Sequence, residues 1–363
     1  MRVKLGDVCE RGTSNLKLSD VSEKNGEFSV FGASGYIGSV DFYQQGYPYV
    51  AVVKDGAGIG RAMLCPGKTS VIGTMQYLLP KDNILPKYLF YVVKYMNLEK
   101  YFTGATIPHI YFKDYKNEEF NFDFWERQVE IVSVLSKCEK VIDLCKQELQ
   151  LLDKLIKARF IELFGDPILN PYGWAVVTIG DIVTDVRYGT SKPAVEGGKY
   201  PYLRMNNLTY DGHLDLSDMK YIDIPDNEIE KCIVRKGDIL FNRTNSIELV
   251  GKTCLFDWID DMVIAGYIIR VRLNEKLLPI VLSSYMNLPS LKEQLRSMAK
   301  GAVNQANINA QELQSIKIYL PPQELQEQFA AFVAQTDKSK VAVQKALDEA
   351  QLLFDSLMQE YFG

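Results

Sequence analysis

The sequence contains few of the residues on which metal sites and many active sites depend. Only two histidines occur among 363 residues, and the six cysteines are scattered with no CxxC pair. We therefore expect no zinc site and no Ser/His/Asp or Cys/His catalytic set. The first residues lack the apolar core of a signal peptide, and no apolar run approaches the ~20 residues of a membrane span. These absences predict a cytoplasmic protein with reduced thiols and no membrane partner.

An excess of basic charge, which would point to nucleic acid, is also missing. The formal net charge is −5. The acidic excess lies mainly in residues 321–363, which hold 3 Lys and Arg against 7 Asp and Glu. The rest of the chain is nearly neutral, so composition permits a local basic face without predicting one. A length of 363 residues predicts at least two domains.

A segment in the middle of the chain is similar in sequence to the segment at its end. A shift of 198 residues aligns 126–165 with 324–363 without a gap, and among the identical pairs are Gln128 with Gln326 and Phe164 with Phe362. Both segments are rich in Leu, Lys, Gln, Glu and Ala and carry no proline over their helical stretch. The repeat therefore predicts two long helices.

Apolar residues in both helical segments follow the same alternating spacing of three and four. Sustained over this length, a 3.5-residue period predicts a coiled-coil seam. Two unrelated amphipathic core helices are the alternative, and they would not explain the shared register. The predicted seam and partner-binding residues are Leu135, Ile142, Leu149, Ile156, Val333, Leu347, Phe354 and Tyr361.

The repeat extends into the segments before each helix, because VKLGDV at 3–8 resembles VTIGDI at 177–182. We expect an α+β protein with an internal pseudo-two-fold repeat, whose two globular heads of mixed sheet and small helices are separated by an antiparallel two-helix coiled coil. A helix of this length is ~60 Å long, and only antiparallel pairing lets the second head join both helices. The predicted segments are the first head (1–124), the first helix (125–165), the linker and second head (166–320) and the second helix (321–363).

Three stretches resemble catalytic or cofactor-binding motifs but lack a residue or a sequence context that each motif needs. In VAVVKDGAGIGRA (50–62) the third glycine of a dinucleotide motif would fall at Arg61, and a strand-like run follows, so a hairpin turn is the better interpretation. PGKTS (66–70) lacks the first glycine of a phosphate-binding loop, since position 62 is alanine. NPY (170–172) lies in the linker without a glycine-rich motif for a methyl donor. We expect a binding protein and not an enzyme.

This layout closely resembles the specificity subunits of type I restriction-modification systems, with its runs LFGDPILNPYGW and YLPPQELQEQFAAFV. The resemblance covers nearly the whole chain. It implies two target recognition domains that read the halves of a split site on double-stranded DNA, and a coiled coil that sets the gap. It also implies adenine methyltransferase partners, two in number, and ATP-dependent restriction subunits in systems that cut. The chain itself would bind no cofactor, because S-adenosylmethionine, ATP and Mg belong to those partners.

Base readout favours Arg, Lys, Asn and Gln on loops, with other polar groups on phosphates. Polar clusters that follow strand-like runs supply the candidates in the second head, and matching places in the repeat supply those in the first. The predicted DNA-binding residues are Lys54, Arg61, Thr74, Gln76, Arg204, Asn206, Arg243 and Asn245. Thr13, Ser14, Thr190 and Ser191 could hold phosphate, but capping of a turn is favoured.

Two other classes remain open at this point. One is a two-headed protein-binding scaffold with a coiled-coil strut and no role on DNA, which composition does not exclude. The other is an enzyme with an unrecognised site, which a pocket lined by perturbed carboxylates would support.

Overall fold

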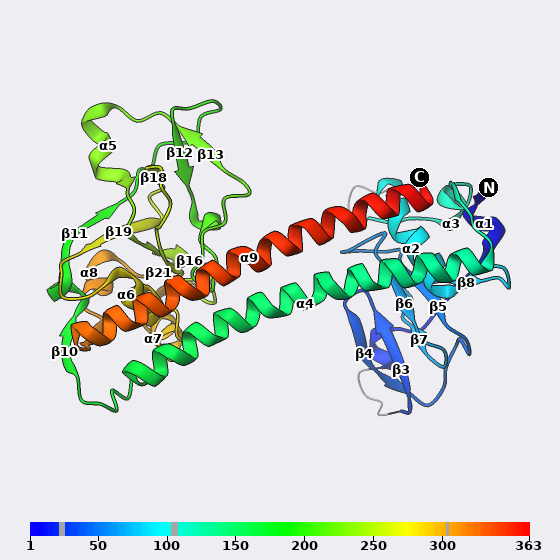
Figure 1. Ribbon diagram of the computed structural model, residues 1–363, viewed down its shortest axis with the longest axis horizontal. Coiled ribbons are helices and arrows are strands. Elements are labelled where there is room, and N and C mark those ends of the chain that lie inside the picture. Colours follow the sequence, from blue (N-terminus) through cyan, green and yellow to red (C-terminus); the bar gives the residue numbers. More distant parts are fainter. Residues whose placement is uncertain (22–25, 103–107, 303–304) are drawn as a thin grey trace. The chain divides into compact units, whose positions relative to one another are not determined.

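The computed structural model describes residues 1–21, 26–102, 108–302 and 305–363 (Figure 1). The chain forms two compact units, one made of Met1–Gln147 with Val343–Gly363 and the other of Glu148–Ala342. The division falls inside the two predicted helical segments, so each unit holds one head and part of both helices. Among the described residues, no helix is long and apolar enough to cross a membrane.

The two predicted helical segments form α4 (Trp125–Phe164) and α9 (Gln323–Phe362), of 40 residues each. In the first unit, Arg127 near the start of α4 lies 5.7 Å from the ring of Tyr361 near the end of α9. In the second unit, Phe160 near the end of α4 lies 5.5 Å from the ring of Phe329 near the start of α9. Within each unit the two helices therefore run antiparallel.

The first unit contains a four-stranded sheet of order β2-β8-β5-β6, a three-stranded sheet of order β4-β3-β7 and the pair β1-β9. Its strands are β1 (Arg2–Lys4), β2 (Cys9–Thr13), β3 (Phe28–Gly32), β4 (Gly35–Val40), β5 (Tyr49–Val53), β6 (Ala62–Cys65), β7 (Ser70–Val71), β8 (Met75–Pro80) and β9 (Glu119–Asn121). Its short helices are α1 (Leu5–Val8), η1 (Leu18–Asp20), α2 (Pro86–Met96), η2 (Leu98–Tyr101) and α3 (Phe112–Tyr115).

The second unit contains sheets of order β11-β19-β15-β17, β13-β12-β18-β14 and β16-β21-β20, and the pair β10-β22. Its strands are β10 (Ala175–Thr178), β11 (Val183–Tyr188), β12 (Tyr200–Leu203), β13 (Lys220–Ile222), β14 (Ile233–Val234), β15 (Ile239–Asn242), β16 (Thr244–Asn245), β17 (Thr253–Leu255), β18 (Met262–Ile264), β19 (Ile268–Leu273), β20 (Lys300–Ala302), β21 (Gln305–Asn307) and β22 (Lys317–Leu320). Its short helices are η3 (Ile179–Ile182), η4 (Met205–Asn207), α5 (Asp226–Cys232), α6 (Pro279–Met286), α7 (Pro289–Met298) and α8 (Ala310–Gln314).

The two heads share a strand plan. The four-stranded sheets β2-β8-β5-β6 and β11-β19-β15-β17 are antiparallel throughout. In the smaller sheets, β3 is parallel to β7, and β12 is parallel to β18. The segments that resemble each other in sequence, 3–8 and 177–182, form the same succession of strand and one helical turn. The prediction of a mixed α and β fold is confirmed.

The glycine-rich segment after β5 is a hairpin turn, as predicted. β5 pairs antiparallel with β6, and the turn between them closes with a hydrogen bond from the N–H of Gly60 to the carbonyl of Val53 at 2.9 Å. Gly58 and Gly60 have φ values of +81° and +78°, which non-glycine residues rarely adopt. The glycines are needed for the turn, so no dinucleotide site has to explain them.

Candidate nucleic-acid interface

Polar residues of the second head gather around two adjoining hollows. The larger, of about 530 Å³, is lined by Arg204, Asn206 and Arg243, together with Thr190, Ser191, Lys192 and Tyr267. The smaller, of about 430 Å³, is lined by Arg243, Thr244, Tyr267, Lys300, Gln305 and Asn307. Because both include Arg243 and Tyr267, we treat them as one surface and call it the second-head groove.

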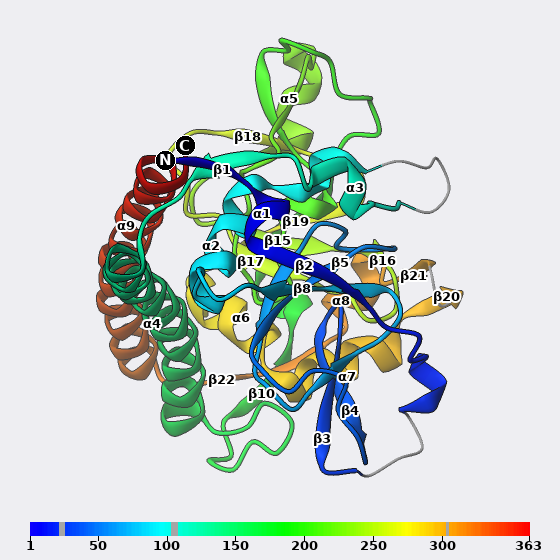
Figure 2. The same cartoon turned by 90° about the vertical axis from the view of Figure 1, so that its right-hand side faces the viewer.

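Strand ends position the groove residues. Arg204 directly follows β12, Asn206 lies in the single turn η4, and Arg243 directly follows β15. The far wall comes from the antiparallel strands β16, β21 and β20, which lie side by side (Figure 2). Polar residues at the ends of buried strands thus meet on one face, whereas the sequence pattern predicted only that polar clusters follow strand-like runs.

The guanidinium of Arg243 is held by stacking. It lies 4.9 Å from the centre of the Tyr188 ring, which belongs to β11. Arg243 forms no ion pair with any residue of the described part of the chain. Stacking on an aromatic face fixes the plane of a guanidinium while leaving its N–H donors available, which suits bidentate recognition of a base edge.

Acidic residues are absent from the lining of the second-head groove, as far as the described residues show. The other three basic residues pair with carboxylates from outside the lining: Lys192 with Glu228 at 2.8 Å, Arg204 with Asp218 at 2.8 Å and Lys300 with Glu312 at 2.5 Å. In a chain with 46 acidic residues, a groove with four basic residues and no acidic one is a favourable surface for a polyanion.

Asn245 is not brought into the groove. Its Nδ2 donates to Oδ1 of Asn242 at 3.2 Å, and its Oδ1 accepts from the N–H of Ser246 at 2.9 Å. Both ends of the amide therefore stabilise the local turn. The hydroxyl of Thr190 similarly accepts from the N–H of Lys192 at 3.2 Å, and that of Ser14 accepts from the N–H of Leu16 at 3.1 Å, which are the turn caps favoured from the sequence.

In the first head, two of the four predicted residues share a hollow. Arg61 and Thr74 line a space of about 420 Å³ with Ala33, Ser34 and Gly58. Arg61 is exposed, and its NH1 donates to the carbonyl of Ala33 at 3.3 Å. As in the second head, no carboxylate of the described residues lines this hollow.

The other two first-head predictions are not placed in this hollow. Lys54 is half-buried and forms an ion pair with Asp55 at 3.6 Å. Gln76 contradicts the prediction outright, because its side chain is only 3% exposed and bonds to the hydroxyl of Tyr115. A buried amide that is already paired cannot reach a base, so Gln76 is a core residue of the first head. Met75, Tyr77 and Leu78 are buried as well, so both faces of β8 are covered here and the strand offers Gln76 no exposed side.

The predicted seam residues lie on the least exposed side of both long helices. Leu135, Ile142, Val333 and Phe354 are buried, and Leu149, Ile156, Leu347 and Tyr361 are partly buried. Met358 and Phe362 are also buried, although they stand outside the predicted spacing. Phe362 lies 5.2 Å from the ring of Tyr88 in α2, so the last turn of α9 packs against the first head and not only against α4.

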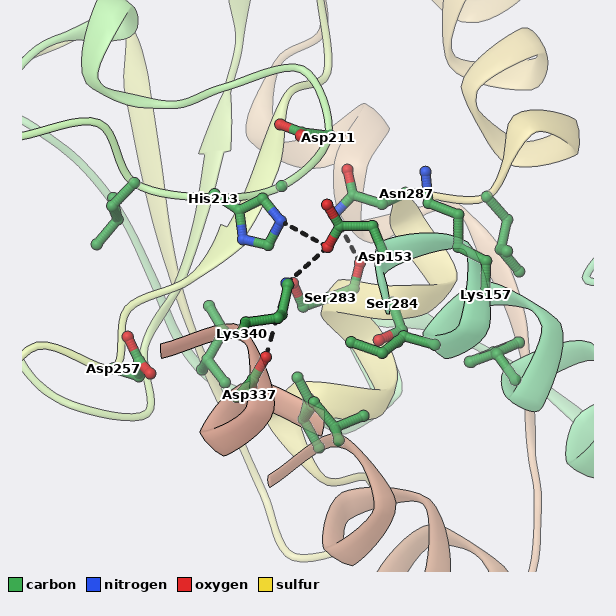
Figure 3. Close-up of a pocket in the computed structure, with 18 residues that line it drawn as sticks. Asp153, Lys157, Asp211, His213, Asp257, Ser283, Ser284, Asn287, Asp337 and Lys340 are labelled. Atoms are coloured by element: carbon green, nitrogen blue, oxygen red, sulfur yellow. Dashed lines mark hydrogen bonds and ion pairs between the residues drawn. The ribbon is translucent and has the colours of Figure 1, made fainter. Parts of the chain in front are cut away.

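A more enclosed cavity of about 160 Å³ lies in the second unit between the loop at 211–214, α6 and the two long helices (Figure 3). In it, Oδ1 of Asp153 accepts hydrogen bonds from Nζ of Lys340 at 2.6 Å and from Nε2 of His213 at 3.3 Å. Burial by itself raises the pKa of Asp153, but the hydrogen bonds and charges of His213 and Lys340 outweigh it and lower the pKa to about 2. Burial raises the pKa of Asp337, which also lines the cavity.

This cavity is where an enzyme or a metal site would be sought. Ligand atoms of Asp153, Asp211 and His213 lie within 4.8 Å of one another, but Lys340 already contacts Asp153 and a cation would have to displace it. The volume is also below the ~300–1,000 Å³ of typical ligand pockets. The shift in the pKa of Asp153 is explained by an ionic tie between α4, α9 and the second head, which needs no substrate.

The prediction from sequence missed part of the second-head groove. Tyr188, Tyr267, Lys300, Gln305 and Asn307 line it or support it without having been singled out. The amide-rich run NQAN at 304–307 was a usable signal for the last two. The two tyrosines carried no such signal, because in the sequence they resemble ordinary strand residues.

A family model described as the type I restriction modification DNA specificity domain matches residues 1–154 and 171–350. The two matches include both heads and most of both long helices, so this chain belongs to that family. The predicted resemblance is confirmed.

Individual relatives agree with this assignment. The chain is 30% identical over 196 residues to a Methanocaldococcus jannaschii protein assigned as the MjaX specificity subunit of a type I restriction enzyme. The aligned segment makes up 53% of this chain and 46% of that protein. It is 27% identical over 182 residues to the EcoKI specificity subunit of Escherichia coli K12, which covers 49% of this chain and 39% of that protein. The matched segments thus span less than half of each relative's length.

Solved structures share the fold over the full chain. The S subunit of a type I restriction-modification system from M. genitalium has a TM-score of 0.58 at 16% identity, covering 100% of this chain and 96% of that one. A chain from a type I R-M system studied for complex assembly and conformational transition has a TM-score of 0.54 at 18% identity, covering 99% and 97%. At these identities the likeness concerns the fold alone.

Proposed function

We propose that this chain is a non-catalytic, cytoplasmic DNA-specificity subunit whose two heads each read half of a split target on double-stranded DNA. The observation that carries the proposal is the second-head groove, where Arg204, Asn206 and Arg243 meet and where no acidic residue of the described chain belongs to the lining. The hollow with Arg61 and Thr74 is the corresponding candidate in the first head. Arginine and asparagine are the side chains that read guanine and adenine edges in the major groove.

The two long helices would act as the spacer that sets the gap between the half-sites. We propose that α4 and α9 pair as an antiparallel coiled coil, which the buried seam residues in each unit support. We further propose that the two heads are diverged copies related by a pseudo-two-fold axis. Their shared strand plan supports this, while the side chains that line the two hollows differ.

A second face of α4 is suited to binding partner subunits. Exposed apolar residues stand one position before the seam: Val134, Val141 and Leu144 in the part of α4 within the first unit, and Leu151 and Leu155 in the part within the second. Their separations of seven, three, seven and four residues follow the register of the seam, with Lys137 and Glu148 at the two intervening positions, so they form a second stripe that another helix can cover. We propose that adenine methyltransferase subunits, two per chain, bind this stripe and carry S-adenosylmethionine. Restriction subunits with ATP and Mg would join in systems that cut.

The near-neutral charge of the chain bears on its affinity. Most non-specific affinity for DNA comes from neutralised phosphates, and three of the four basic groove residues already have carboxylate partners. We therefore expect weak DNA binding by the isolated chain and much tighter binding by its complex with methyltransferase subunits. Tight, specific binding by the isolated chain at physiological salt would contradict this part of the proposal.

The test replaces Arg243 by alanine in the gene, with its neighbouring genes kept, and maps methylated adenine by modified-base sequencing. We expect the wild type to give a motif in two halves with a fixed gap, and Arg243→Ala to make one half degenerate while the other is unchanged. Arg187→Ala is the matched control, because Arg187 is an exposed arginine of the same head that pairs with Asp185 outside the groove. A motif unchanged by Arg243→Ala would overturn the assignment of the groove, and methylation that does not depend on the gene would favour the protein scaffold.

A further inference from the structure

Lys252 is a buried lysine beneath the second-head groove. It directly precedes β17, and only 8% of it is exposed. Its Nζ donates to the backbone carbonyl of Leu208 at 2.9 Å and to that of Met205 at 3.3 Å. No carboxylate of the described residues forms an ion pair with it. A buried lysine without an acidic partner is rare, because removing the ammonium from water is costly.

The two carbonyls belong to the turn that displays Asn206. Met205 and Leu208 stand on either side of Asn206 and Asn207 in the chain. Asn206 is exposed in the groove, whereas Asn207 is buried and closes the turn by accepting from the N–H of Arg204 at 2.9 Å. The side chain of Lys252 therefore holds this turn from inside the head at both ends.

The backbone of Lys252 is tied to the other readout element. Its carbonyl accepts from the N–H of Asn242 at 2.8 Å, and the N–H of Gly251 donates to the carbonyl of Asn242 at 3.0 Å. Asn242 is the last residue of β15 and directly precedes Arg243. A single residue thus connects the end of the strand that carries Arg243 with the turn that carries Asn206.

We propose that Lys252 is a positioning residue, which fixes Asn206 relative to Arg243 and thereby sets how sharply the second head discriminates between bases. This inference rests on the proposed function of the groove. Reading two neighbouring base pairs needs two side chains at a fixed separation, and readout weakens when the supporting contacts allow either one to move. Burial lowers the pKa of Lys252, but an amine without its extra proton still has two N–H donors for the two carbonyls.

A second buried lysine in the same head provides the control. Lys292 in α7 is 4% exposed, and its Nζ donates to the carbonyl of Gly251 at 3.0 Å. It makes no hydrogen bond to the carbonyls of the turn at 205–208 among the described residues. Replacing either lysine by methionine removes a buried amine and keeps most of the volume, but only Lys252→Met releases the turn.

The experiment introduces Lys252→Met, Lys292→Met and Arg243→Ala separately into the gene in its own cells. Modified-base sequencing then compares the methylated fraction at preferred sites with that at sites differing by one base pair. For sites altered in the second head's half, we expect Lys252→Met to lower this ratio about tenfold, the order of one lost base contact. The ratio for the first head's half should be unchanged, and Lys292→Met should change the second head's ratio far less than Lys252→Met does, because Lys292 bonds to Gly251 and not to the turn that carries Asn206.

Other outcomes would overturn the inference. Lys252 is only a stabilising residue if Lys252→Met and Lys292→Met change the ratios by the same amount. The same conclusion follows if neither variant changes either ratio. The double variant Asn206→Ala with Lys252→Met gives a further test. If it lowers the ratio of methylation at preferred to altered sites more than Asn206→Ala alone does, Lys252 does not act through Asn206. Should Lys252→Met fail to fold, Lys252→Gln, which keeps an N–H donor on a shorter side chain, is judged by the same ratios. An effect of Lys252→Met without one of Arg243→Ala would instead contradict the proposed function of the groove.

Discussion

Gln128 and Gln326 make the same set of hydrogen bonds in the two units. Oε1 of Gln128 accepts from the N–H of Leu85 at 2.9 Å, and Oε1 of Gln326 accepts from the N–H of Leu278 at 2.9 Å. Each Nε2 donates to two backbone carbonyls at 2.9–3.1 Å. The two leucines directly precede the prolines that start α2 and α6. A buried amide at the start of each long helix therefore fixes the N-terminus of a short helix of its head, α2 in one unit and α6 in the other, and this explains why both copies of the repeat have glutamine here.

The first prediction concerns the stability of the second unit. Gln326→Leu would leave the N–H of Leu278 and two carbonyls unpaired in the interior, since Gln326 is almost fully buried. We expect a loss of about 3 kcal/mol in the free energy of unfolding, measured by denaturant titration. Gln323→Leu is the control, because Gln323 is exposed on the same helix and should change that free energy by less than about 0.5 kcal/mol. Equal effects of the two variants would contradict the role assigned to Gln326.

The second prediction concerns acid stability. The pKa of Asp153 falls from 3.8 to about 2 in the folded state, so its ion pairs stabilise the fold above about pH 4 and lose their effect as the pH falls towards 2. For a partly buried group of this shift we expect a contribution of about 1–2 kcal/mol. Asp153→Asn should flatten the loss of stability between pH 4 and pH 2 in denaturant titrations at a series of pH values. Asp260→Asn, at an exposed aspartate of the same unit, should leave the slope unchanged.

The third prediction tests the partner stripe. Leu151→Glu combined with Leu155→Glu places two charges where a partner helix would pack, and we expect binding of the methyltransferase subunit to weaken at least tenfold. Both leucines are exposed, so the melting temperature of the chain alone should hardly change. Lys154→Glu, an exposed substitution between them, is the control. Calorimetry of binding would contradict the stripe if the double variant retained full affinity.

The fourth prediction separates phosphate contacts from base readout. Lys300 is highly exposed at the rim of the groove, whereas Arg243 is stacked inside it. Lys300→Gln should weaken binding equally on all DNA sequences and reduce the slope of log affinity against log salt by about 1. Arg243→Ala should relax discrimination at one position of the half-site, by about 1–3 kcal/mol. Fluorescence titrations of the complex at several salt concentrations distinguish the two patterns. If Lys300→Gln instead relaxed discrimination and Arg243→Ala weakened binding equally on all sequences, the groove would be oriented differently on DNA.

Much of the fold was predictable because its signals are local or periodic. The spacing of Leu135, Ile142 and Phe354 identifies a buried side of each helix from the sequence alone, since a helix places every third or fourth residue on one face. The hairpin at Gly58 and Gly60 was predictable for a similar reason, because only glycine adopts such φ values easily. The burial of Met358 was not predicted, because Met358 stands outside that spacing and is buried by its place in the hydrophobic core of the first unit.

The site was predictable only in part. Arg204, Asn206 and Arg243 follow strand-like runs, so the sequence by itself determined that polar groups stand at strand ends and that two copies of one scaffold carry them. Only the tertiary structure decided which of them meet. In the folded chain, Gln76 lies in the core and the side chain of Asn245 stabilises a turn. Tyr188 and Lys252, from other strands and loops, lie next to the groove residues. Periodicity fixes the face of an element, but the distance between residues far apart in the chain depends on how sheets and loops pack, which one sequence does not encode in any local pattern.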